Sequence, residues 1–311
     1  MRAFIFPGQG SQAVGMGKEL AESHSTAREV FQEVDHALEQ NLFQLMCDGP
    51  EDELMLTENA QPAIMANAIA TFRVMDKEGG KDIDQLCNYV AGHSLGEYSA
   101  LCAAGALNLT TTAKLLKLRG QAMQKAVPVG EGGMAALLGA DIKKASGLAK
   151  ASAQGEVCTV ANDNDPTQVV ISGHMAAIDR AIDAVKDHDI KRGVKLPVSA
   201  PFHCSLMKPA AEAMEEALAE STILPPKVPV FANVTAAAAD DVDVIRQLLV
   251  EQVTGTVRWR ESVLAMSEQG VDEFVEFGGK VLGGMVKRIN RDANNVSLIS
   301  MADIEAFLKD A

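Results

Sequence analysis

The chain has 311 residues, of which 47% are hydrophobic and 23% charged, and its formal net charge at pH 7 is −14. This length and composition allow a sizeable core, in one large domain or in a large domain joined to a small one. The negative charge argues against nucleic-acid binding, which needs a basic face, but a few local Lys or Arg side chains could still hold an anionic substrate.

The cysteines and the N-terminal residues indicate in which compartment of the cell the protein resides. The five cysteines are scattered and form no C-x-x-C pair, which argues against a disulfide framework and against a zinc site. The first apolar run covers residues 3–6 before Pro7, too few for a signal peptide, and no run approaches membrane-spanning length. We therefore expect a cytoplasmic protein that binds no metal and does not enter a membrane.

Short apolar runs alternate with longer helical patterns along most of the chain. The predicted strands of this part span residues 3–6, 86–91, 228–233 and 273–277. Helices are predicted over residues 95–104 and 110–126, and residues 236–239 are expected to form a loop before another helix. Strands separated by helices are typical of a parallel sheet, so we predict an α/β-hydrolase-like large domain.

The middle of the chain has a different order of elements. Strands are predicted over residues 134–138, 157–161, 168–172 and 193–198, with helices over 141–153 and 175–188. This is the β-α-β-β-α-β order of ferredoxin-like domains, with a hairpin across the polar residues 162–167. Because Gly and Pro residues flank this stretch, we predict a ferredoxin-like insert over residues 130–200 and a discontinuous large domain over 1–129 and 201–311.

Residues 92–96 read GHSLG and match the pattern G-x-S-x-G. An apolar run precedes them and a helical pattern follows, which is the setting of a nucleophile elbow. Ser94 would then lie at a helix N-terminus, where free N–H groups stabilise a developing negative charge. The alternative is a tight strand-to-helix turn in which Ser94 is a small polar cap.

A serine nucleophile needs a base, and His203 is the best placed of the six histidines. It follows the last predicted strand of the insert, where the chain re-enters the large domain and where a cleft commonly forms. The alternative is a half-buried loop histidine without a catalytic role.

Arg119 shares one helix face with Leu115, Leu116 and Met123. An arginine in an apolar stripe must find an anion or reach solvent. The partner could be a substrate, a carboxylate of the chain itself, or water at the surface.

Taken together, these motifs resemble one family. FPGQGSQ at residues 6–12, GHSLGE at 92–97, LRG at 118–120, PFH at 201–203 and Gln252 occur in this order, and the chain closely resembles malonyl-CoA:acyl carrier protein transacylases of bacterial fatty-acid synthesis. The resemblance covers nearly the whole chain, the insert included.

The resemblance implies a role for each matching residue. Ser94 would be the acylated nucleophile and His203 its general base and acid, oriented by the backbone carbonyl of Gln252 instead of an aspartate. The backbone N–H groups of Gln9 and Leu95 would form the oxyanion hole. Arg119 would hold the malonyl carboxylate in a bidentate pair.

Three further residues are placed in the substrate site by the same resemblance. Met123 lies on the face of Arg119, and Phe202 precedes the base, where a ring would crowd a 2-methyl branch of the acyl group. Asn162 matches a family loop near the cleft.

The resemblance further implies a ping-pong reaction with malonyl-CoA and acyl carrier protein, no metal or other cofactor, and a monomer. Because carrier proteins are acidic, the docking surface should be a local basic patch, either Lys186, Lys191, Arg192 and Lys195 or Lys287, Arg288 and Arg291; solvated helix faces are the alternative for both.

Other functions remain open from sequence alone. A polyketide acyltransferase or the transacylase subunit of a malonate decarboxylase would share the same residues. A serine thioesterase or hydrolase would share the G-x-S-x-G motif, and a non-catalytic carrier-protein-binding module is a third class.

Overall fold

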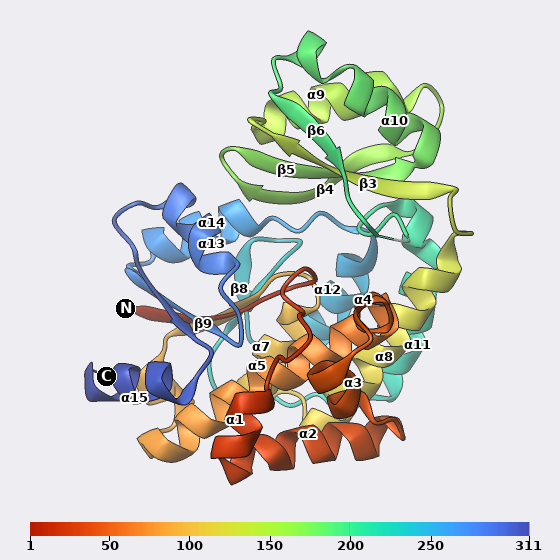
Figure 1. Cartoon of the computed structure of the whole chain (residues 1–311). Coiled ribbons are helices and arrows are strands. Elements are labelled where there is room, and N and C mark those ends of the chain that lie inside the picture. The colour runs from red at the N-terminus through yellow and green to blue at the C-terminus, as the bar shows by residue number, and fades with distance from the viewer. Residues whose placement is uncertain (199, 311) are drawn as a thin grey trace.

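The chain forms two domains in a computed structural model that describes residues 1–198 and 200–310 (Figure 1). Ser199, inside the predicted insert, and Ala311, at the end of the predicted large domain, lie outside the described residues. The smaller domain projects from one end of the larger one, and a single stretch of chain crosses between them in each direction (Figure 1).

Within the described residues, six strands form the larger sheet, in the order β10-β9-β1-β2-β7-β8. They are β1 (Arg2–Phe6), β2 (Tyr89–Gly92), β7 (Val230–Ala232), β8 (Ala237–Ala239), β9 (Glu273–Phe277) and β10 (Asn294–Leu298). Neighbouring strands from β10 to β7 run parallel, whereas β8 pairs antiparallel with β7.

The α/β prediction for the large domain is thus confirmed, but the loop expected over residues 236–239 is wrong. Ala237–Ala239 pair with β7 as an edge strand, a role that their small side chains permit on an exposed margin of the sheet, and only Ala236 stays in the turn before it.

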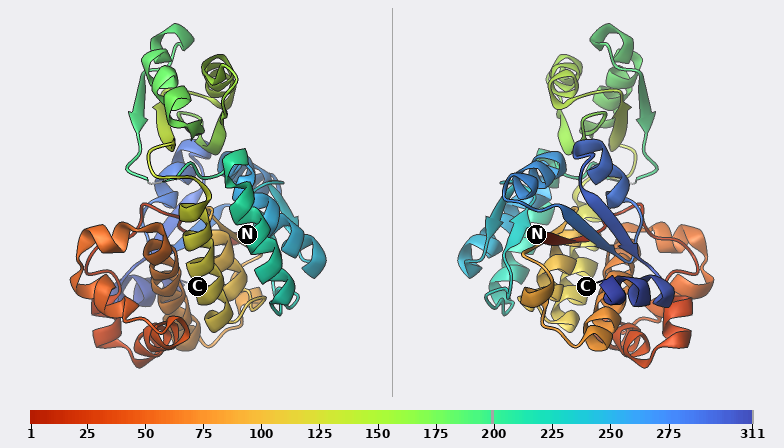
Figure 2. Two further views of the ribbon diagram at one scale, coloured as in Figure 1. Left: turned by 90° about the vertical axis from the view of Figure 1, so that its right-hand side faces the viewer. Right: turned by 90° about the vertical axis from the view of Figure 1, so that its left-hand side faces the viewer.

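Both faces of the larger sheet are buried, as the alternation of β1 shows. Phe4 and Phe6 belong to the core beneath one group of helices, whereas Ala3 and Ile5 pack with Trp259 on the other side. Successive side chains of a strand point to opposite faces, so a central parallel strand must be apolar throughout. Figure 2 shows the sheet between the orange and yellow helices, with the dark blue α15 (Met301–Asp310) beside them, and the blue helices α13 (Trp259–Glu268) and α14 (Leu282–Ile289) on the other side.

The helices of the large domain surround this sheet, and the last of them lies at the C-terminal end of the chain. They are α1 (Lys18–Ser23), α2 (Ser25–Leu38), α3 (Leu42–Asp48), α4 (Glu51–Met55), α5 (Thr57–Gly79), α6 (Ile83–Leu86), α7 (Gly96–Ala103), α8 (Leu109–Ala126), α11 (Lys208–Glu220), α12 (Val242–Thr254), α13 (Trp259–Glu268), α14 (Leu282–Ile289) and α15 (Met301–Asp310), with a 3-10 turn, η2 (Ser205–Met207). None of the described helices combines the length and the apolar character needed to cross a membrane.

The smaller domain has the predicted β-α-β-β-α-β order. Its elements are β3 (Gly132–Leu138), α9 (Ile142–Ala153), β4 (Cys158–Asp165), β5 (Gln168–His174), α10 (Met175–Asp183), a 3-10 turn η1 (Val185–His188) and β6 (Arg192–Lys195). The strands lie in the order β4-β5-β3-β6, and each neighbouring pair is antiparallel. The ferredoxin-like fold is therefore confirmed.

One part of the insert differs from its prediction. The polar residues expected at the tip of the hairpin extend β4 instead, so the strand ends at Asp165 and a short turn leads to Gln168. Residues 162–165 are buried despite their polar side chains. Buried polar groups need partners, and in this strand the large domain supplies some of them and Thr167 and Gln168 of the insert supply others.

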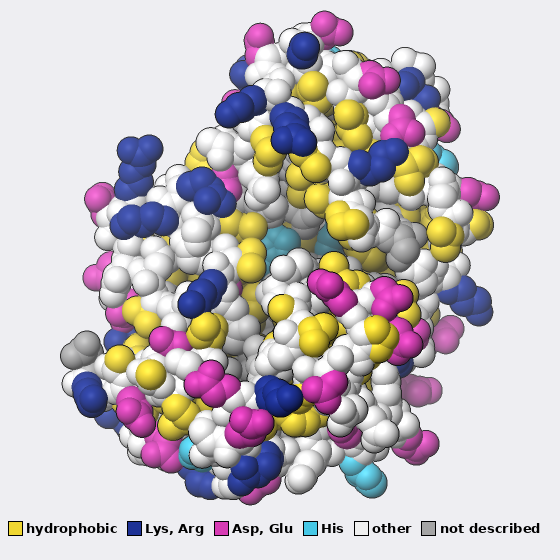
Figure 3. All heavy atoms as spheres, viewed as in Figure 1, with side chains coloured by type: hydrophobic (Ala, Val, Ile, Leu, Met, Phe, Trp, Pro, Cys, Tyr) yellow, Lys and Arg dark blue, Asp and Glu magenta, His cyan; other side chains and the backbone are white. Residues whose placement is uncertain are grey.

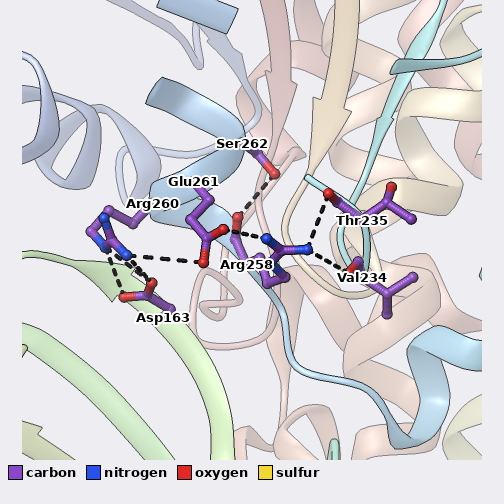
Figure 4. A network of polar contacts seen from close by, with 7 residues as sticks. All are labelled: Asp163, Val234, Thr235, Arg258, Arg260, Glu261 and Ser262. Atoms are coloured by element: carbon purple, nitrogen blue, oxygen red, sulfur yellow. Dashed lines mark hydrogen bonds and ion pairs between the residues drawn. The ribbon is translucent and has the colours of Figure 1, made fainter. Parts of the chain in front are cut away.

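The outer half of β4 is held against the large domain by backbone and ionic contacts. Val257 N–H donates to Ala161 O at 2.8 Å, and Asp163 N–H donates to Val257 O at 2.9 Å. The Asp163 carboxylate accepts hydrogen bonds from Arg260, 2.8 Å from Nη2, and Figure 4 shows this pair beside the Arg258–Glu261 pair of the same helix.

A second ion pair repeats this arrangement on the neighbouring helix. The Asp165 carboxylate, which is 0% exposed, lies 2.8 Å from the Nε of Arg288 on α14. The insert is thus fixed to α13 and α14 by two acidic side chains of one strand.

Candidate active site

The loops that follow β1, β2 and β7 meet at the carboxyl edge of the larger sheet, beneath the insert. In parallel sheets this edge is where ligands bind. A cavity of about 200 Å³ lies here between the two domains. The large domain lines it with Gln9, Ser94, Arg119 and His203 among others, and the insert with Met134, Asn162 and residues 196–198. Figure 3 shows the hollow, with histidine side chains at its bottom.

Ser94 lies on a sharp turn between β2 and α7. Its φ is 53°, in the left-handed region, which residues other than glycine adopt infrequently. A Cβ at Gly92 would lie 1.9 Å from the backbone of Gly96, and a Cβ at Gly96 would lie 2.2 Å from the carbonyl oxygen of Phe6. Both glycines of the motif are therefore required by close backbone approach, and the turn presents Ser94 to the cavity.

His203 connects the nucleophile to a backbone acceptor. Its Nε2 is 2.7 Å from Ser94 Oγ, and its Nδ1 is 2.9 Å from the carbonyl oxygen of Gln252. A carbonyl can only accept, so Nδ1 carries the proton and Nε2 is free to accept one from the serine hydroxyl. The ring is 4% exposed. His203 is thus more buried than the half-buried loop histidine that sequence left open.

The surroundings keep the His203 ring neutral. Burial, and next the positive charge of Arg119, lower the pKa of His203 from its ordinary value near 6.5 to about 3. A neutral imidazole with a free Nε2 is the form that a general base requires.

Arg119 extends from α8 to the same place and is 1% exposed. Its Nη1 donates to Gln61 Oε1 at 2.7 Å, and its Nη2 donates to Gln252 Oε1 at 2.9 Å and to Ser94 Oγ at 3.2 Å. Its Nε has no hydrogen-bond partner among the described residues. Within residues 1–198 and 200–310, no carboxylate lies within ion-pair distance of this guanidinium, so the buried cation is left without a direct counter-charge beside the nucleophile.

Gln9 and Leu95 contribute backbone N–H groups at the cavity wall. In the part of the chain that the structure describes, neither N–H has a protein acceptor, although both residues line the cavity. The side chain of Gln9 is held from behind, because its Oε1 accepts from Thr57 Oγ1 at 3.1 Å. Two free N–H groups beside a serine hydroxyl are the arrangement that stabilises an oxyanion.

The remaining predicted residues also line the cavity. Met123 and Phe202 are buried, at 1% and 7% exposed, and form part of its apolar wall. Asn162 lies in β4 and not in a hairpin loop, and forms a bridge to Val257 of the large domain. All the residues that sequence assigned to the site therefore line the cavity, except Gln252, which contacts Ser94, His203 and Arg119 from behind.

Sequence reasoning missed three residues of this site. Asn233, after β7, accepts from Ser94 N–H at 2.8 Å and donates from Nδ2 to Gly92 O at 2.7 Å. Gln61, on α5, holds Arg119. Glu97, the last residue of the GHSLGE motif, has no role in the sequence analysis, yet its carboxylate accepts from Gln252 and Asn233. A polar residue at the carboxyl end of a predicted parallel strand was the available signal for Asn233. The signal for Gln61 was a glutamine within the otherwise apolar run of residues 60–66.

The comparisons with known proteins agree with this geometry. The chain matches the family model described as acyl transferase domain over residues 3–285. It is 45% identical to the malonyl CoA-acyl carrier protein transacylase of Salmonella typhimurium over 288 residues, 92% of each chain.

Solved structures give the same result. An acyl-carrier-protein-S-malonyltransferase from Bartonella henselae is 49% identical, with a TM-score of 0.97 over 99% of this chain and 98% of that one. A malonyl-transacylase in complex with a type II PKS acyl-carrier protein is 39% identical, with a TM-score of 0.96 over 100% of this chain and 99% of that one. The chain therefore belongs to the acyl transferase domain family and, within it, to the malonyl CoA-acyl carrier protein transacylases.

Proposed function

We propose that this protein transfers a malonyl group from malonyl-CoA to the phosphopantetheine thiol of acyl carrier protein, and so supplies malonyl-ACP for fatty-acid synthesis. The observation that carries the proposal is the Arg119 guanidinium, which is buried, has no ion pair among the described residues, and lies 3.2 Å from Ser94 Oγ. A cation in this position selects an acyl group that ends in an anion.

The first half-reaction acylates Ser94. His203 Nε2 takes the hydroxyl proton while Oγ bonds to the thioester carbonyl carbon. The carbonyl oxygen becomes an oxyanion, which the N–H groups of Gln9 and Leu95 stabilise. The carbon–sulfur bond then breaks, and CoA leaves as a thiol with the proton returned by His203 Nε2. The backbone carbonyl of Gln252 keeps the ring oriented throughout, since it accepts from Nδ1 at 2.9 Å.

The same residues catalyse the second half-reaction, in which the steps of acylation occur in the opposite order with a new thiol. The carrier-protein thiol gives its proton to His203 and attacks the ester carbonyl, and Ser94 leaves with that proton. This chemistry needs only groups of the chain and of the two substrates, so we propose that no metal or other cofactor takes part.

Arg119 accounts for the choice of acyl group. In malonyl-CoA a single methylene separates the thioester carbonyl from the carboxylate, so the anion of the bound acyl group would lie near Ser94 Oγ, as the guanidinium does. A bidentate guanidinium–carboxylate pair is stronger than a neutral hydrogen bond. An acetyl group would leave the buried cation unpaired, whereas a longer dicarboxylic chain would have to fold back to reach it.

The carrier protein must approach the mouth of the cavity. Figure 3 shows Lys and Arg side chains above and to the left of the hollow, on the insert and the neighbouring part of the large domain, and Asp and Glu side chains mainly below it. In each of the two predicted basic patches one member already forms an ion pair. Lys195 pairs with Asp179, and Arg288 pairs with Asp165. An acidic carrier protein would contact the basic side of the mouth, and the other members of these patches are the charges available to it. A monomer in the cytoplasm is part of the same proposal.

Transfer to a polyketide carrier protein is a second candidate, since one similar structure is a transacylase with a type II PKS acyl-carrier protein. The ratio of kcat/KM for a fatty-acid carrier protein to that for a polyketide carrier protein distinguishes the two. Hydrolysis is less well supported, because a hydrolase has no need of a buried cation beside its serine.

Intact-protein mass spectrometry after treatment with malonyl-CoA tests the proposal. We expect an adduct of about 86 Da, the mass of a malonyl group less the lost proton, which maps to Ser94 and disappears when carrier-protein thiol is added. Ser94→Ala is the matched control and should take up no adduct. An adduct elsewhere, or release of free malonate faster than transfer to the thiol, would contradict the proposed function.

A further inference from the structure

Gln252 touches each of the three residues to which the proposed mechanism assigns the chemistry. Its backbone carbonyl orients His203, its Nε2 donates to the carbonyl oxygen of Ser94 at 2.9 Å, and its Oε1 accepts from Arg119 Nη2 at 2.9 Å. The side chain is fully buried. The direction of its amide therefore decides where the guanidinium of Arg119 is held.

Glu97 fixes the direction of that amide. Its Oε2 accepts from Gln252 Nε2 at 2.9 Å and from the backbone N–H of Asn233 at 2.9 Å. With Ser94 O and Glu97 Oε2 as acceptors, both protons of the Gln252 amide are used, and a flipped amide would set its NH₂ group against the guanidinium. Carboxylate, amide and guanidinium thus form one chain of hydrogen bonds, in which each polarises the next.

Glu97 is buried away from the substrate. It is 2% exposed and is not among the described residues that line the cavity. Burial raises the pKa of its carboxyl to about 7, opposed by the hydrogen bonds from Gln252 and Asn233 and by the charge of Arg119. Burying a carboxyl destabilises the fold. The Glu97 carboxyl contacts residues that lie directly behind the proposed substrate-binding side chains, and not a partner at the surface.

We propose that Glu97 is a positioning residue that sets the acyl-group preference of this chain, because it holds the Gln252 amide that aims Arg119 at the acyl carboxylate. The inference rests on the proposed function, since it concerns malonyl selection at the same site. The proposal concerns Arg119 and not His203, because His203 is oriented by the backbone carbonyl of Gln252 and not by its amide.

The test is the ratio of kcat/KM for malonyl-CoA to that for acetyl-CoA, with enzyme concentration set by titration of the reactive serine. Glu97→Ala should lower the malonyl value about 10- to 100-fold, the usual effect of losing a hydrogen bond to a charged group, and change the acetyl value much less. Glu97→Gln keeps an oxygen acceptor at this position and should retain most of the discrimination.

Two further variants separate positioning from folding. Gln252→Leu should lower the ratio at least as much as Glu97→Ala, because it removes the acceptor of Arg119 and the bond to Ser94 O together with the bond to Glu97. The double variant should be no worse than Gln252→Leu alone, because the Glu97–Gln252 bond is already lost there. Glu276→Ala is the matched control: Glu276 is also a buried carboxylate that accepts two backbone N–H groups, from Val281 and Gly283, but lies outside the cavity. It should lower the melting temperature and leave the ratio unchanged.

The results distinguish a positioning role of Glu97 from a purely structural one. If Glu97→Ala resembles Glu276→Ala, with a lower melting temperature and an unchanged ratio, the positioning role is wrong. It is equally wrong if the effects of Glu97→Ala and Gln252→Leu multiply, or if Glu97→Gln is as damaged as Glu97→Ala. A wild-type protein without preference for malonyl-CoA would instead overturn the proposed function itself.

Discussion

The bottom of the cavity and the outer half of β4 both bury charged side chains, but they treat the charge differently. In β4, Asp163 and Asp165 each meet an arginine of the large domain at 2.8 Å. At the bottom of the cavity, Arg119 is surrounded by neutral acceptors, Gln61, Gln252 and Ser94. Charge is neutralised where the contact joins two domains, and is left unneutralised where an anionic ligand would arrive.

Backbone strain also distinguishes the bottom of the cavity from the outer half of β4. Ser94 and His203 both lie in the left-handed region, with φ of 53° and 58°. These residues would take part in bond making, and the surrounding hydrogen bonds hold them in place. Substitutions at the bottom of the cavity should therefore change rates, whereas substitutions in the outer half of β4 should change stability.

The largest effect is expected from His203→Ala. Loss of the base should slow both acylation by malonyl-CoA and transfer to the carrier protein by about 10²- to 10⁴-fold, since one imidazole serves both steps. Stopped-flow measurement of the two half-reactions checks this. His188→Ala, which removes an imidazole outside the cavity, should leave both rates unchanged; slowing of one half-reaction alone would mean that a second base exists.

Asp163→Ala should act mainly on stability. Arg260 would keep only its 3.9 Å contact with Glu261, and the insert would lose one of the two ion pairs that join it to the large domain among the described residues. The free energy of unfolding should therefore fall by about 1–3 kcal/mol in denaturant titrations. The rate of acylation should change by less than about tenfold, because no group that contacts the acyl chain is altered.

The matched control for this prediction is an exposed pair. Lys208 and Glu212 lie 3.9 Å apart with side chains 77% and 62% exposed, and Lys208→Ala should cost no more than about 0.5 kcal/mol. An equal loss for Asp163→Ala and Lys208→Ala would show that β4 is not fixed by its ion pairs.

The smallest effect concerns pH. Because burial and Arg119 lower the pKa of His203 to about 3, the imidazole should stay neutral as the pH falls from 8 to 5. The ¹³C and ¹⁵N chemical shifts of a His203-labelled protein should therefore stay constant over this range. A titration with a midpoint near 6.5 would show that the ring is far less shielded from solvent and charge than the structure indicates.

The sequence predicted those parts of the site that a short motif or a single chemical type can reveal. GHSLG gave the position of Ser94 because the close backbone approach in the turn demands glycine on both sides. Arg119 was found as a charge in an apolar stripe, and His203 as a polar residue where two domains join. The alternation of β1 and the order of elements in the insert follow from side-chain periodicity.

The missed parts depend on contacts between distant segments. The outer half of β4 reads as a polar loop. It is a strand because it pairs with β5 and because Val257, Arg260 and Arg288 supply partners for its buried polar groups across the domain boundary. Glu97 and Asn233 are ordinary polar residues in sequence, and their role is visible only once β2, β7 and α12 lie side by side.

The most direct measurement of the central claim is the rate at which malonyl-CoA and acetyl-CoA acylate Ser94 in Arg119→Ala and in the wild-type protein. If the buried guanidinium binds the acyl carboxylate, kcat/KM for malonyl-CoA should fall about 10²- to 10³-fold, while acetyl-CoA reacts at least as well as before. An unchanged ratio between the two substrates would contradict the account, because the unpaired cation beside Ser94 would then have no part in choosing the acyl group.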